Sequence, residues 1–415
     1  MNEIPNPASG ILDLAADKEK IASFLAHQEE TGKKQHDPDQ FAAMEAYLYS
    51  DEYPADLERL KQGDYFFPAP FHYRITKSTS GKKRDVYAFK GAPLYILRMV
   101  SWVMHDYDDT MFPPGLYSFR RNIHGKDFLR KIRSFRNLNR FWVVKSDVSN
   151  YVGSIVPELI IPRLEQMWGH DPALLGLLKF LLLRRECIER DGTVVACEPG
   201  GLGGLPVANF FMNVYLMEMD WYFSARSPLY CRYSDDIVFL ARSREEAEDY
   251  LKTFYQILEE KRLYTNPAKT QLIEPGGAVE ILGFLVRDGV VDLSDHAIDK
   301  IYHKIRTRAN RLLRYKKRAQ LEDRVVGEKM VRFCNRVFFG TFQPHELCWA
   351  RWYFPIITTT DRLKQVDRYA QDAIRLVMNG SMHKRRYNVR YEDLQALGYR
   401  SLVHAYYHTD PEHWL

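Results

Sequence analysis

Two adjacent aspartates lie between two apolar runs in the segment Arg232-Tyr233-Ser234-Asp235-Asp236-Ile237-Val238-Phe239-Leu240. Residues 229–241 are typical of a β-hairpin whose turn falls at Ser234-Asp235-Asp236. Such a turn places both carboxylates at the edge of a sheet, where burying two like charges is costly unless a cation neutralises them. The segment therefore predicts either an oxygen-ligated site for Mg²⁺ or Mn²⁺, or a solvated turn.

A second carboxylate occurs in the same kind of context. Asp147 ends the apolar run Trp142-Val143-Val144-Lys145-Ser146-Asp147, after which the chain is expected to turn into a helix near Tyr151. Two carboxylates at the ends of separate strands can hold two metal ions about 3.5–4 Å apart, which activates a 3′-hydroxyl and stabilises the leaving oxygen. This combination favours the metal site over the solvated turn, with Asp147, Asp235 and Asp236 as the predicted ligands.

The composition is that of a folded protein with a polyanionic partner. The 415 residues are 13% aromatic and 27% charged, which excludes a disordered chain. Residues 1–60 carry 13 Asp and Glu against 5 Lys and Arg, a balance of −8, so the total of +5 leaves +13 for the remainder. A basic body of this kind favours nucleic acid as the partner.

Cysteines and hydrophobic runs give an expectation about location. The five cysteines form no CxxC pair, and we interpret them as reduced thiols of a cytoplasmic protein. The sequence has no apolar run of about 18 residues, the length that a membrane span needs. Its start lacks the basic and apolar pattern of a secretory signal. We therefore expect no membrane partner.

Several elements are predicted around the carboxylates. Residues 74–77 and 85–89 are expected to form a hairpin with a basic tip, and residues 206–223 have the length and apolar spacing of a helix. Residues 295–340 are expected to be helical, and residues 341–415 mainly helical and basic.

Two basic stretches favour contact with nucleic acid. Residues 300–318 hold nine Lys and Arg and no acid, and residues 120–140 hold eight against one. In the first stretch Ile301, Ile305 and Ala309 recur at helical spacing, so one face is expected in the core and a charged face along phosphates. Either stretch alone also fits an ordinary solvated helix face.

Five segments follow one another in a characteristic order: DVSNYVGSI from Asp147, PGGLGGLPVANFFMNVYL at 199–216, YSDD at 233–236, NPAKTQ at 266–271 and LGF at 282–284. This order resembles the motifs of reverse transcriptases, most of all the prokaryotic group that includes group II intron and retron enzymes. The resemblance covers about residues 70–290.

The resemblance implies an α+β right-hand polymerase with fingers, a palm of antiparallel sheet and helices, a helical thumb and a helical C-terminal region. On this basis we expect a helical segment over residues 1–65, and fingers and palm over residues 66–290. The thumb is expected over residues 291–340, and a basic helical module over residues 341–415.

The resemblance also implies roles for individual residues. Asp147 and Asp235 would hold the metal ions with Asp236 beside them, and Lys269 would lie near the pyrophosphate, where it could protonate the leaving group. Basic side chains of the hairpin would clamp the triphosphate, and residues 200–209 would lie against the template base and the incoming nucleotide. The residues implied to contact substrate are Arg74, Lys82, Arg84, Arg120, Tyr151, Val152, Gly204, Pro206, Asn209 and Tyr233.

The sequence departs from the related enzymes at the position that excludes the ribose 2′-hydroxyl. That position, the fifth after the first aspartate, is usually Phe or Tyr, and here it is Val152, preceded by Tyr151. Either Tyr151 takes over this role, or the choice between deoxyribose and ribose is relaxed. The glycine-rich segment also has Gly200 where related enzymes usually have Gln.

The segments YRITKSTSGKKRDVY and LYSFRRNIHGKD and the short helical tail resemble the stand-alone reverse transcriptases of bacterial antiphage defence, and we favour the type 2 subgroup. The resemblance implies an RNA-directed DNA polymerase that copies a dedicated structured non-coding RNA into cDNA from dNTPs, with two Mg²⁺ ions or Mn²⁺. The alternatives are a retron or group II intron-type enzyme with another role, an RNA-copying RNA polymerase, and a catalytically silent RNA-binding scaffold.

Overall fold

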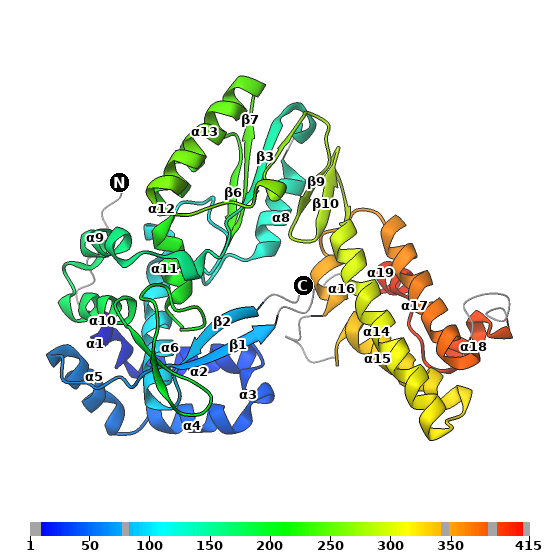
Figure 1. Ribbon diagram of the computed structural model, residues 1–415, viewed down its shortest axis with the longest axis horizontal. Helices are drawn as coiled ribbons and strands as arrows, with labels where there is room; N and C mark the ends of the chain where they lie inside the picture. Colours follow the sequence, from blue (N-terminus) through cyan, green and yellow to red (C-terminus); the bar gives the residue numbers. More distant parts are fainter. Residues whose placement is uncertain (1–9, 77–82, 136, 342–347, 381–387, 410–415) are drawn as a thin grey trace. The chain divides into compact units, whose positions relative to one another are not determined.

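The computed structural model of the protein describes residues 10–76, 83–135, 137–341, 348–380 and 388–409. The chain divides into two compact units, each built from two segments: Met1–Phe128 with Phe141–Pro275, and Leu129–Arg140 with Gly276–Leu415. Both units combine helices with antiparallel strands, and the second ends in helices, which confirms the predicted α+β class with a helical C-terminal region (Figure 1). The N-terminal helices belong to the first compact unit, while the four-part functional division remains a prediction.

The first unit is organised around an antiparallel sheet, the central sheet, in the order β6-β7-β3-β8. Val144 of β3 pairs with Phe239 of β7, and both side chains are fully buried. Helix α13 (Arg244–Glu260) packs on this sheet through Phe254, whose ring lies next to that of Phe239. The four strands are β3 (Trp142–Asp147), β6 (Tyr230–Tyr233), β7 (Asp236–Ala241) and β8 (Gln271–Ile273). They confirm the predicted strand before Asp147 and the predicted hairpin.

A second sheet of the first unit has the order β2-β1-β4-β5. Strands β1 and β2 pair in antiparallel fashion, as predicted for this hairpin, and β1 meets β4 in parallel at Phe71 and Ile188. The four strands are β1 (Phe71–Thr76), β2 (Lys83–Ala88), β4 (Glu186–Ile188) and β5 (Val194–Ala196).

Helices supply most of the core of the first unit. The Asp171 side chain caps α10 and also accepts a 2.7 Å hydrogen bond from the backbone N–H of Ile11, which joins the start of the chain to the middle. The N-terminal helices are α1 (Ile11–Ala15), α2 (Lys18–Glu30), α3 (Lys33–His36), α4 (Pro38–Leu48) and α5 (Glu52–Gln62). Further along the chain lie α6 (Ala92–Met104), α7 (Asp108–Met111), α9 (Pro157–Trp168) and α10 (Pro172–Leu182). Short 3₁₀ turns lie at His105–Tyr107, Val152–Ser154 and Pro267–Lys269. Residues of α8 (Gly125–Ser134) belong partly to the first unit and partly to the second.

The single helix predicted from Pro206 to Phe223 is two helices. Helix α11 (Ala208–Tyr215) ends at Leu216, whose φ of −109° and ψ of 14° are not helical, and α12 (Met217–Arg226) follows directly. Leu216 is fully buried, and no Gly or Pro marks the break. Neither the apolar pattern nor a helix-breaking residue therefore marks this break in the sequence.

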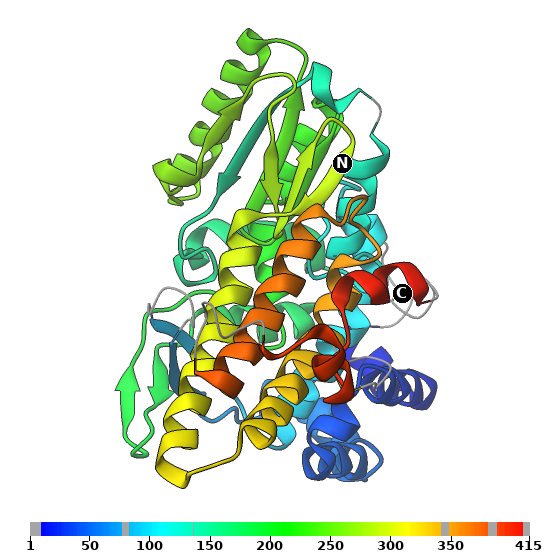
Figure 2. The same ribbon diagram turned by 90° about the vertical axis from the view of Figure 1, so that its right-hand side faces the viewer.

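The second unit combines a small sheet of order β11-β10-β9 with a group of helices. Helices α14 and α17 run side by side, and the rings of Tyr302 and Tyr369 stack between them with centroids 3.9 Å apart (Figure 2). The strands are β9 (Val279–Ile281), β10 (Phe284–Arg287) and β11 (Val290–Leu293). A 3₁₀ turn lies at Leu138–Arg140. The helices are α14 (Asp295–Ala319), α15 (Asp323–Phe339), α16 (Trp349–Tyr353), α17 (Asp361–Asn379), α18 (Tyr391–Ala396) and α19 (Leu402–His408). The prediction of helices over residues 295–340 is confirmed.

Within the described part of the chain, none of the helices has the length and apolar character needed to cross a lipid bilayer.

Candidate active site

Three aspartates meet at one edge of the central sheet. Asp147, the last residue of β3, is paired with Asp236, the first residue of β7. Directly opposite residues of an antiparallel pair lie on the same face, with Cβ atoms roughly 4.5–5.5 Å apart. Asp235 precedes Asp236, and its carbonyl accepts a 3.0 Å hydrogen bond from the N–H of Val148. The structure therefore brings the three predicted metal ligands together.

The hairpin that carries two of these aspartates has a tight turn. Tyr233 pairs directly with Asp236, so the loop consists of Ser234 and Asp235 alone, and Asp236 belongs to the strand. Ser234 has a φ of 59°, as two-residue hairpin loops require at their first position. The turn thus fixes Asp235 beside the end of β3.

The crowding of negative charge raises the pKa of one aspartate. The pKa of the Asp236 carboxyl is raised to about 6, first by burial and then by the charge of Asp235, while Lys145 opposes the shift. Asp147 adds a further upward contribution. A cation among these carboxylates would relieve the repulsion, because it favours the charged form of each.

Lys269 lies at the same edge. Its Nζ atom is 2.7 Å from Oδ2 of Asp147. The 3₁₀ turn that carries Lys269 begins at Asn266, whose side chain accepts a 3.1 Å hydrogen bond from the N–H of Ala268. The Lys269 side chain is 56% exposed, so it contacts Asp147 and remains open to solvent.

The donor set fits a hard divalent cation. Asp147, Asp235 and Asp236 offer only carboxylate oxygens, which Mg²⁺ and Mn²⁺ prefer. The side chains as they stand are not a ready-made metal cluster: among the described residues no three His, Cys, Asp or Glu side chains converge closely enough to hold an ion. Lys269 instead neutralises Asp147. The chemistry of the donors and the raised pKa of Asp236 therefore support a metal site at these three aspartates.

A buried ion pair next to the turn stabilises the β6–β7 hairpin. Arg232 and Asp220 are both fully buried, and Arg232 Nε lies 2.7 Å from Asp220 Oδ1. Arg232 Nη1 also reaches the carbonyl oxygen of Ser234 at 3.4 Å. The Tyr230 hydroxyl donates a 2.6 Å hydrogen bond to Asp220. This pair was not predicted, although an arginine inside an apolar strand is a signal that a buried acid lies nearby.

The glycines of residues 200–209, the glycine segment, lie close to the backbone of neighbouring strands and turns. The N–H of Tyr87 in β2 donates a 2.8 Å hydrogen bond to the carbonyl of Gly203. Gly204 has a φ of +107°, and a Cβ added there would lie 2.7 Å from the Tyr87 carbonyl oxygen. The absence of a side chain at Gly204 therefore lets the loop pack against the β1–β2 hairpin, and the contact of residues 200–209 with template base and nucleotide remains a prediction.

Tyr151 and Val152 have different surroundings. Tyr151 is 3% exposed, and its hydroxyl donates a hydrogen bond to the carbonyl of Met212, while burial raises its pKa. Val152 is only partly buried and lies against the glycine segment, with Cγ1 3.0 Å from the place of a Cβ on Gly203. The Tyr151 side chain thus lies in the core while Val152 is partly exposed, which favours Val152, and which of the two residues discriminates between the sugars remains a prediction.

The basic residues of the β1–β2 hairpin point to opposite faces. Arg74 and Asp85 are directly opposite in the pairing, and Arg74 Nε lies 3.4 Å from Asp85 Oδ1. Arg84 is on the other face, which it shares with Val86, since side chains alternate along a strand. Val86 Cγ1 lies 2.7 Å from the place of a Cβ on Gly204, so the Arg84 face is the one next to the glycine segment. Arg84 therefore remains a candidate for the triphosphate clamp, whereas Arg74 belongs to the opposite face; Lys82 is outside the described residues.

The Arg120 side chain is buried and hydrogen-bonded within the protein. Its side chain is 3% exposed, and its guanidinium donates to the carbonyls of Pro113 and Leu116 at 3.1 Å and pairs with Asp109. Arg120 is therefore held by the loop before it and by Asp109 of α7, and its contact with template or nucleotide remains a prediction.

Asn209, Pro206 and Tyr233 are three further residues that were predicted to contact substrate. Asn209 is exposed, whereas every other residue of α11 is buried, so its amide is the polar group that this helix presents. The Pro206 carbonyl accepts a 3.3 Å hydrogen bond from Ser101 Oγ. Tyr233 is half-buried, and burial raises its pKa. Their contacts with substrate remain predictions.

Comparison with known families gives one match. The profile of the family described as "Reverse transcriptase (RNA-dependent DNA polymerase)" matches residues 93–286. This segment includes the three aspartates, Lys269 and the glycine segment. No curated protein matches the chain in sequence.

Solved structures similar to this chain include telomerases from two Candida species. Apo telomerase from Candida tropicalis is 10% identical, with a TM-score of 0.47 over 75% of this chain and 57% of that one. Telomerase from Candida albicans in complex with the TWJ fragment of telomeric RNA is 11% identical, with a TM-score of 0.45 over 85% and 66%. A C. tropicalis telomerase truncated from its C-terminal domain is 12% identical, with a TM-score of 0.43 over 55% of each chain. This chain thus spans between 55% and 66% of the length of these telomerases.

Proposed function

We propose that the protein copies RNA into DNA by two-metal nucleotidyl transfer, on the premise that residues 93–286, which match the reverse transcriptase family, form the domain of an RNA-directed DNA polymerase. The observation that carries the proposal is the pairing of Asp147 with Asp236 at the end of the central sheet, with Asp235 in the adjoining two-residue turn. A scaffold without activity would have no need to keep three carboxylates at one sheet edge against their repulsion.

Reverse transcriptase domains use divalent metal ions, and Asp147, Asp235 and Asp236 are the residues that would hold two Mg²⁺ ions, or Mn²⁺, here. Such ions, when bound, lower the pKa of an attacking 3′-hydroxyl and stabilise charge on the leaving oxygen. Arg84 would bind the triphosphate from the hairpin face next to the glycine segment. Lys269 lies beside Asp147, and we assign to it the protonation of the leaving pyrophosphate.

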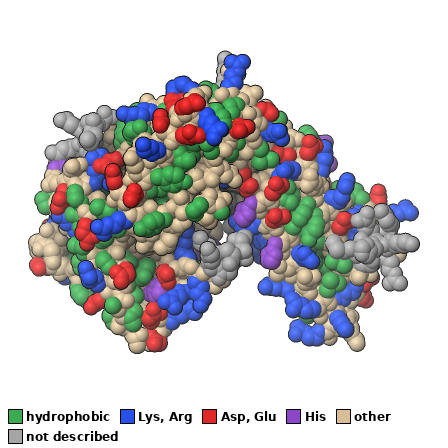
Figure 3. All heavy atoms as spheres, turned by 45° about the horizontal axis from the view of Figure 1, so that its top comes forward, with side chains coloured by type: hydrophobic (Ala, Val, Ile, Leu, Met, Phe, Trp, Pro, Cys, Tyr) green, Lys and Arg blue, Asp and Glu red, His purple; other side chains and the backbone are tan. Residues whose placement is uncertain are grey.

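Helix α14 would bind nucleic acid through its outer face. Its buried side chains include Ile301, Ile305, Ala309 and Leu312, so the opposite faces are free. Figure 3 shows a group of Lys and Arg side chains, among other residues, at the lower right of the visible face. Charges spaced by three, four or seven residues lie on one side of a helix and can follow a phosphate backbone. The exposed basic residues at this spacing are Lys300, Lys304, Arg311, Arg314 and Arg318.

We further propose that the template is a dedicated structured non-coding RNA and that the biological role is antiphage defence. The support is the resemblance of the fingers segments and of the short helical tail to stand-alone defence enzymes. A phage challenge of cells that carry the wild-type protein or the Asp235→Ala/Asp236→Ala variant tests this role. Equal plaque numbers on both would contradict it.

The activity is tested by purifying the protein from its host, sequencing the RNA that accompanies it, and supplying labelled dNTPs with Mg²⁺. One abundant RNA extended into complementary DNA is the expected result. Bound RNA without incorporation of dNTPs would favour the scaffold, and incorporation of rNTPs alone would favour an RNA-copying RNA polymerase.

Replacing Lys269 with alanine is expected to lower the rate of nucleotide incorporation roughly 100-fold or more, the usual contribution of a positioned proton donor. Lys269→Arg keeps the ion pair with Asp147, but an arginine does not release its proton at neutral pH. Both variants should therefore be slow in single-turnover incorporation. Full activity of Lys269→Arg would show that Lys269 only neutralises Asp147.

Enlarging Val152 to phenylalanine is expected to increase the preference for dNTPs over rNTPs roughly tenfold or more, the scale of a steric mismatch in a tight pocket. The reason is that Val152, unlike Tyr151, is partly exposed beside the glycine segment. The measurement is the ratio of kcat/KM for a dNTP and its rNTP. Tyr151→Phe is the control and should leave that ratio unchanged; a shift in the control alone would make Tyr151 the discriminating residue.

A further inference from the structure

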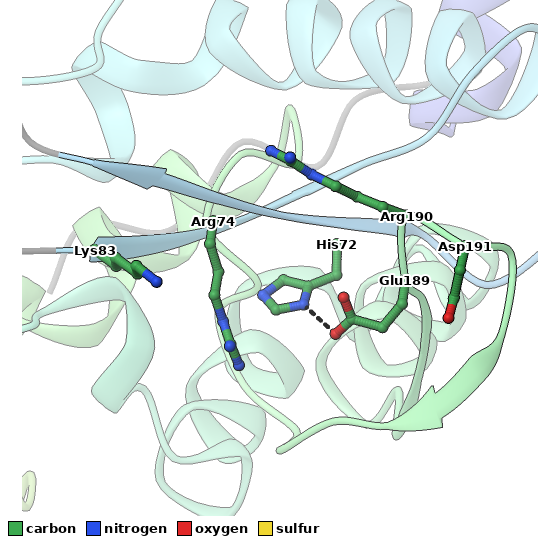
Figure 4. A pocket seen from close by; sticks show the side chains of 6 residues that line it. All are labelled: His72, Arg74, Lys83, Glu189, Arg190 and Asp191. Carbon is green, nitrogen blue, oxygen red and sulfur yellow. Dashed lines mark hydrogen bonds and ion pairs between the residues drawn. The ribbon is translucent and has the colours of Figure 1, made fainter.

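A histidine is buried among charged groups on the face of the β1–β2 hairpin that points away from the glycine segment. The side chain of His72 is 7% exposed and forms part of the wall of a pocket. Figure 4 shows its ring between the Arg74 side chain, on the same strand, and the Glu189 carboxylate, on the loop that joins β4 to β5. The lining residues are His72, Arg74, Lys83, Glu189, Arg190 and Asp191.

Each ring nitrogen of His72 is hydrogen-bonded to a carboxyl group. Nδ1 lies 2.8 Å from Glu189 Oε1, and Nε2 lies 2.8 Å from Asp85 Oδ1. A neutral imidazole has one N–H donor and one acceptor nitrogen, whereas an ionised carboxylate can only accept. Two carboxylates therefore require a hydrogen on both ring nitrogens, which is the charged imidazolium. Loss of one proton would leave a nitrogen lone pair facing a carboxylate oxygen.

The charges next to His72 agree with a protonated ring. Burial lowers the pKa of His72, but the hydrogen bonds to Glu189 and Asp85 and the charges of these acids outweigh burial and raise it overall. In turn, the hydrogen bond to His72 lowers the pKa of Asp85, with a smaller contribution from Arg74, whose Nε lies 3.4 Å from Asp85 Oδ1. One imidazolium therefore fastens β1 to β2 and to the β4–β5 loop.

The other groups packed around this contact do not change charge near neutral pH. Tyr87 stacks on the His72 ring with centroids 5.0 Å apart, and burial raises its pKa to about 12. Burial also raises the pKa of the Cys187 and Cys197 thiols, which lie near Tyr87. Asp191 accepts two hydrogen bonds within its own turn, which lower its pKa. The remaining charged residues of the pocket are Arg74, Lys83 and Arg190.

The contact reaches the opposite face of the hairpin through β2. Asp85, which His72 holds, lies between Arg84 and Val86, and the side chains of these two neighbours point to the other face. On that face Val86 Cγ1 lies 2.7 Å from the place of a Cβ on Gly204. Strand β2 is therefore held from one side by the imidazolium and from the other by the glycine segment, and Arg84 lies between these two contacts along the chain.

We propose that His72 is a positioning residue: as an imidazolium it fastens β2 to the β4–β5 loop and thereby holds Arg84 in place for the triphosphate of the incoming nucleotide. The proposal rests on the proposed function, in which Arg84 binds the triphosphate. Because both hydrogen bonds favour the charged ring, the fastening is complete below the ordinary histidine pKa of about 6.5 and is lost as the pH rises through the raised pKa of His72. Nucleotide binding should therefore weaken as the pH rises through this range.

The first test measures the pKa of His72 by NMR of protein labelled with ¹³C at the histidine Cε1 atoms, with His72→Gln to assign the signal. We expect a wild-type value above about 6.5 and a lower value in Glu189→Gln, because glutamine can donate to Nδ1 of a neutral ring. Glu186→Gln removes an exposed acid of β4 in the same sheet and should leave the pKa unchanged. A wild-type value at or below about 6.5, or an equal value in Glu189→Gln, would overturn the proposal.

The second test measures kcat and KM for a dNTP from about pH 6 to about pH 9, a range that spans the ordinary histidine pKa. The KM of wild type and of Glu186→Gln should rise roughly tenfold over this range, the scale of one hydrogen bond to a charged group, while the KM of Glu189→Gln stays flat. The pH dependence of kcat should be the same in all three. His72→Arg keeps a charged donor for both acids at every pH and should give a low, flat KM. Parallel KM profiles in wild type and Glu189→Gln would contradict the positioning role.

Hydrogen exchange separates this inference from the proposed function. The protection of the β2 amides, compared at each pH, should fall with rising pH in wild type relative to Glu189→Gln, whether or not the protein incorporates nucleotides. This fall without any incorporation of dNTPs would remove the proposed polymerase activity and leave the fastening of the hairpin standing. Equal protection of β2 in both proteins at every pH would overturn the fastening itself.

Discussion

The Asp235→Ala/Asp236→Ala variant should lose DNA synthesis by at least about a thousandfold, because metal-ion catalysis supplies several kcal/mol and each 1.36 kcal/mol corresponds to tenfold in rate. Asp147 would remain, but a single carboxylate paired with Lys269 cannot hold two divalent ions. RNA binding should stay close to the wild-type value, since the exposed cations of α14 and of the hairpin are untouched.

The stability of this variant provides a second readout. Asp235 and Asp147 raise the pKa of the buried Asp236 carboxyl, which means that the three charges repel one another in the metal-free protein. Removing two of them should therefore leave the melting temperature in metal-free buffer equal to or above that of the wild type. Mg²⁺ should raise the melting temperature of the wild type alone, because a ligand stabilises only the state that binds it.

The measurement is the incorporation of labelled dNTPs on an RNA template by the wild type and the double variant, with the same fraction of each protein bound to RNA. Asp249→Ala is the control, as it removes an exposed aspartate of α13 in the same unit. Synthesis retained by the double variant would overturn the metal-site assignment. Loss of synthesis accompanied by loss of RNA binding would instead indicate damage to the fold.

The meeting of the aspartates could be predicted from the sequence because strand geometry leaves little freedom. Asp147 ends an apolar strand and Asp236 begins another, and the two-residue turn at Ser234-Asp235 sets the register between them. The period of two along each strand then decides which side chains share a face. The same regularity explains why the hairpins and the α+β class were predicted correctly.

The directions of side chains outside the strands could not be predicted in this way. Tyr151 directly precedes the short 3₁₀ turn that Val152 begins; Tyr151 is buried with its hydroxyl bonded to the Met212 carbonyl, while Val152 stays partly exposed. Arg74 and Arg84 are both basic and exposed, and only the register of β1 with β2 shows that they occupy opposite faces. Arg120 lies in a basic stretch, yet backbone carbonyls of its own loop enclose it. In each case tertiary contacts, which the local pattern does not contain, decide the environment.

Replacing Asp220 with alanine should lower the free energy of unfolding by about 3–5 kcal/mol, the cost of leaving a buried partner uncompensated. Burial opposes the charge of Arg232, but Asp220 outweighs burial and raises the pKa of this guanidinium, so Arg232 stays charged. Without Asp220 that charge would remain in the core, with the carbonyls of Ser234 and Asn213 as weaker partners at 3.4 and 3.3 Å. Chemical denaturation of the two proteins measures the difference, and Asp249→Ala, exposed on α13, should change it by less than about 0.5 kcal/mol.

A double substitution separates the stability of the pair from its role at the turn. Asp220→Leu/Arg232→Met replaces both charges with apolar side chains of comparable size, and such replacements often restore stability. They do not restore the hydrogen bond from Arg232 to the Ser234 carbonyl, which supports the turn that carries Asp235. We therefore expect the double variant to regain much of the lost free energy of unfolding while its DNA synthesis remains below the wild-type rate. Recovery of both properties would mean that the ion pair stabilises the core without positioning the aspartates, since a turn that needed Arg232 could not work with methionine in its place.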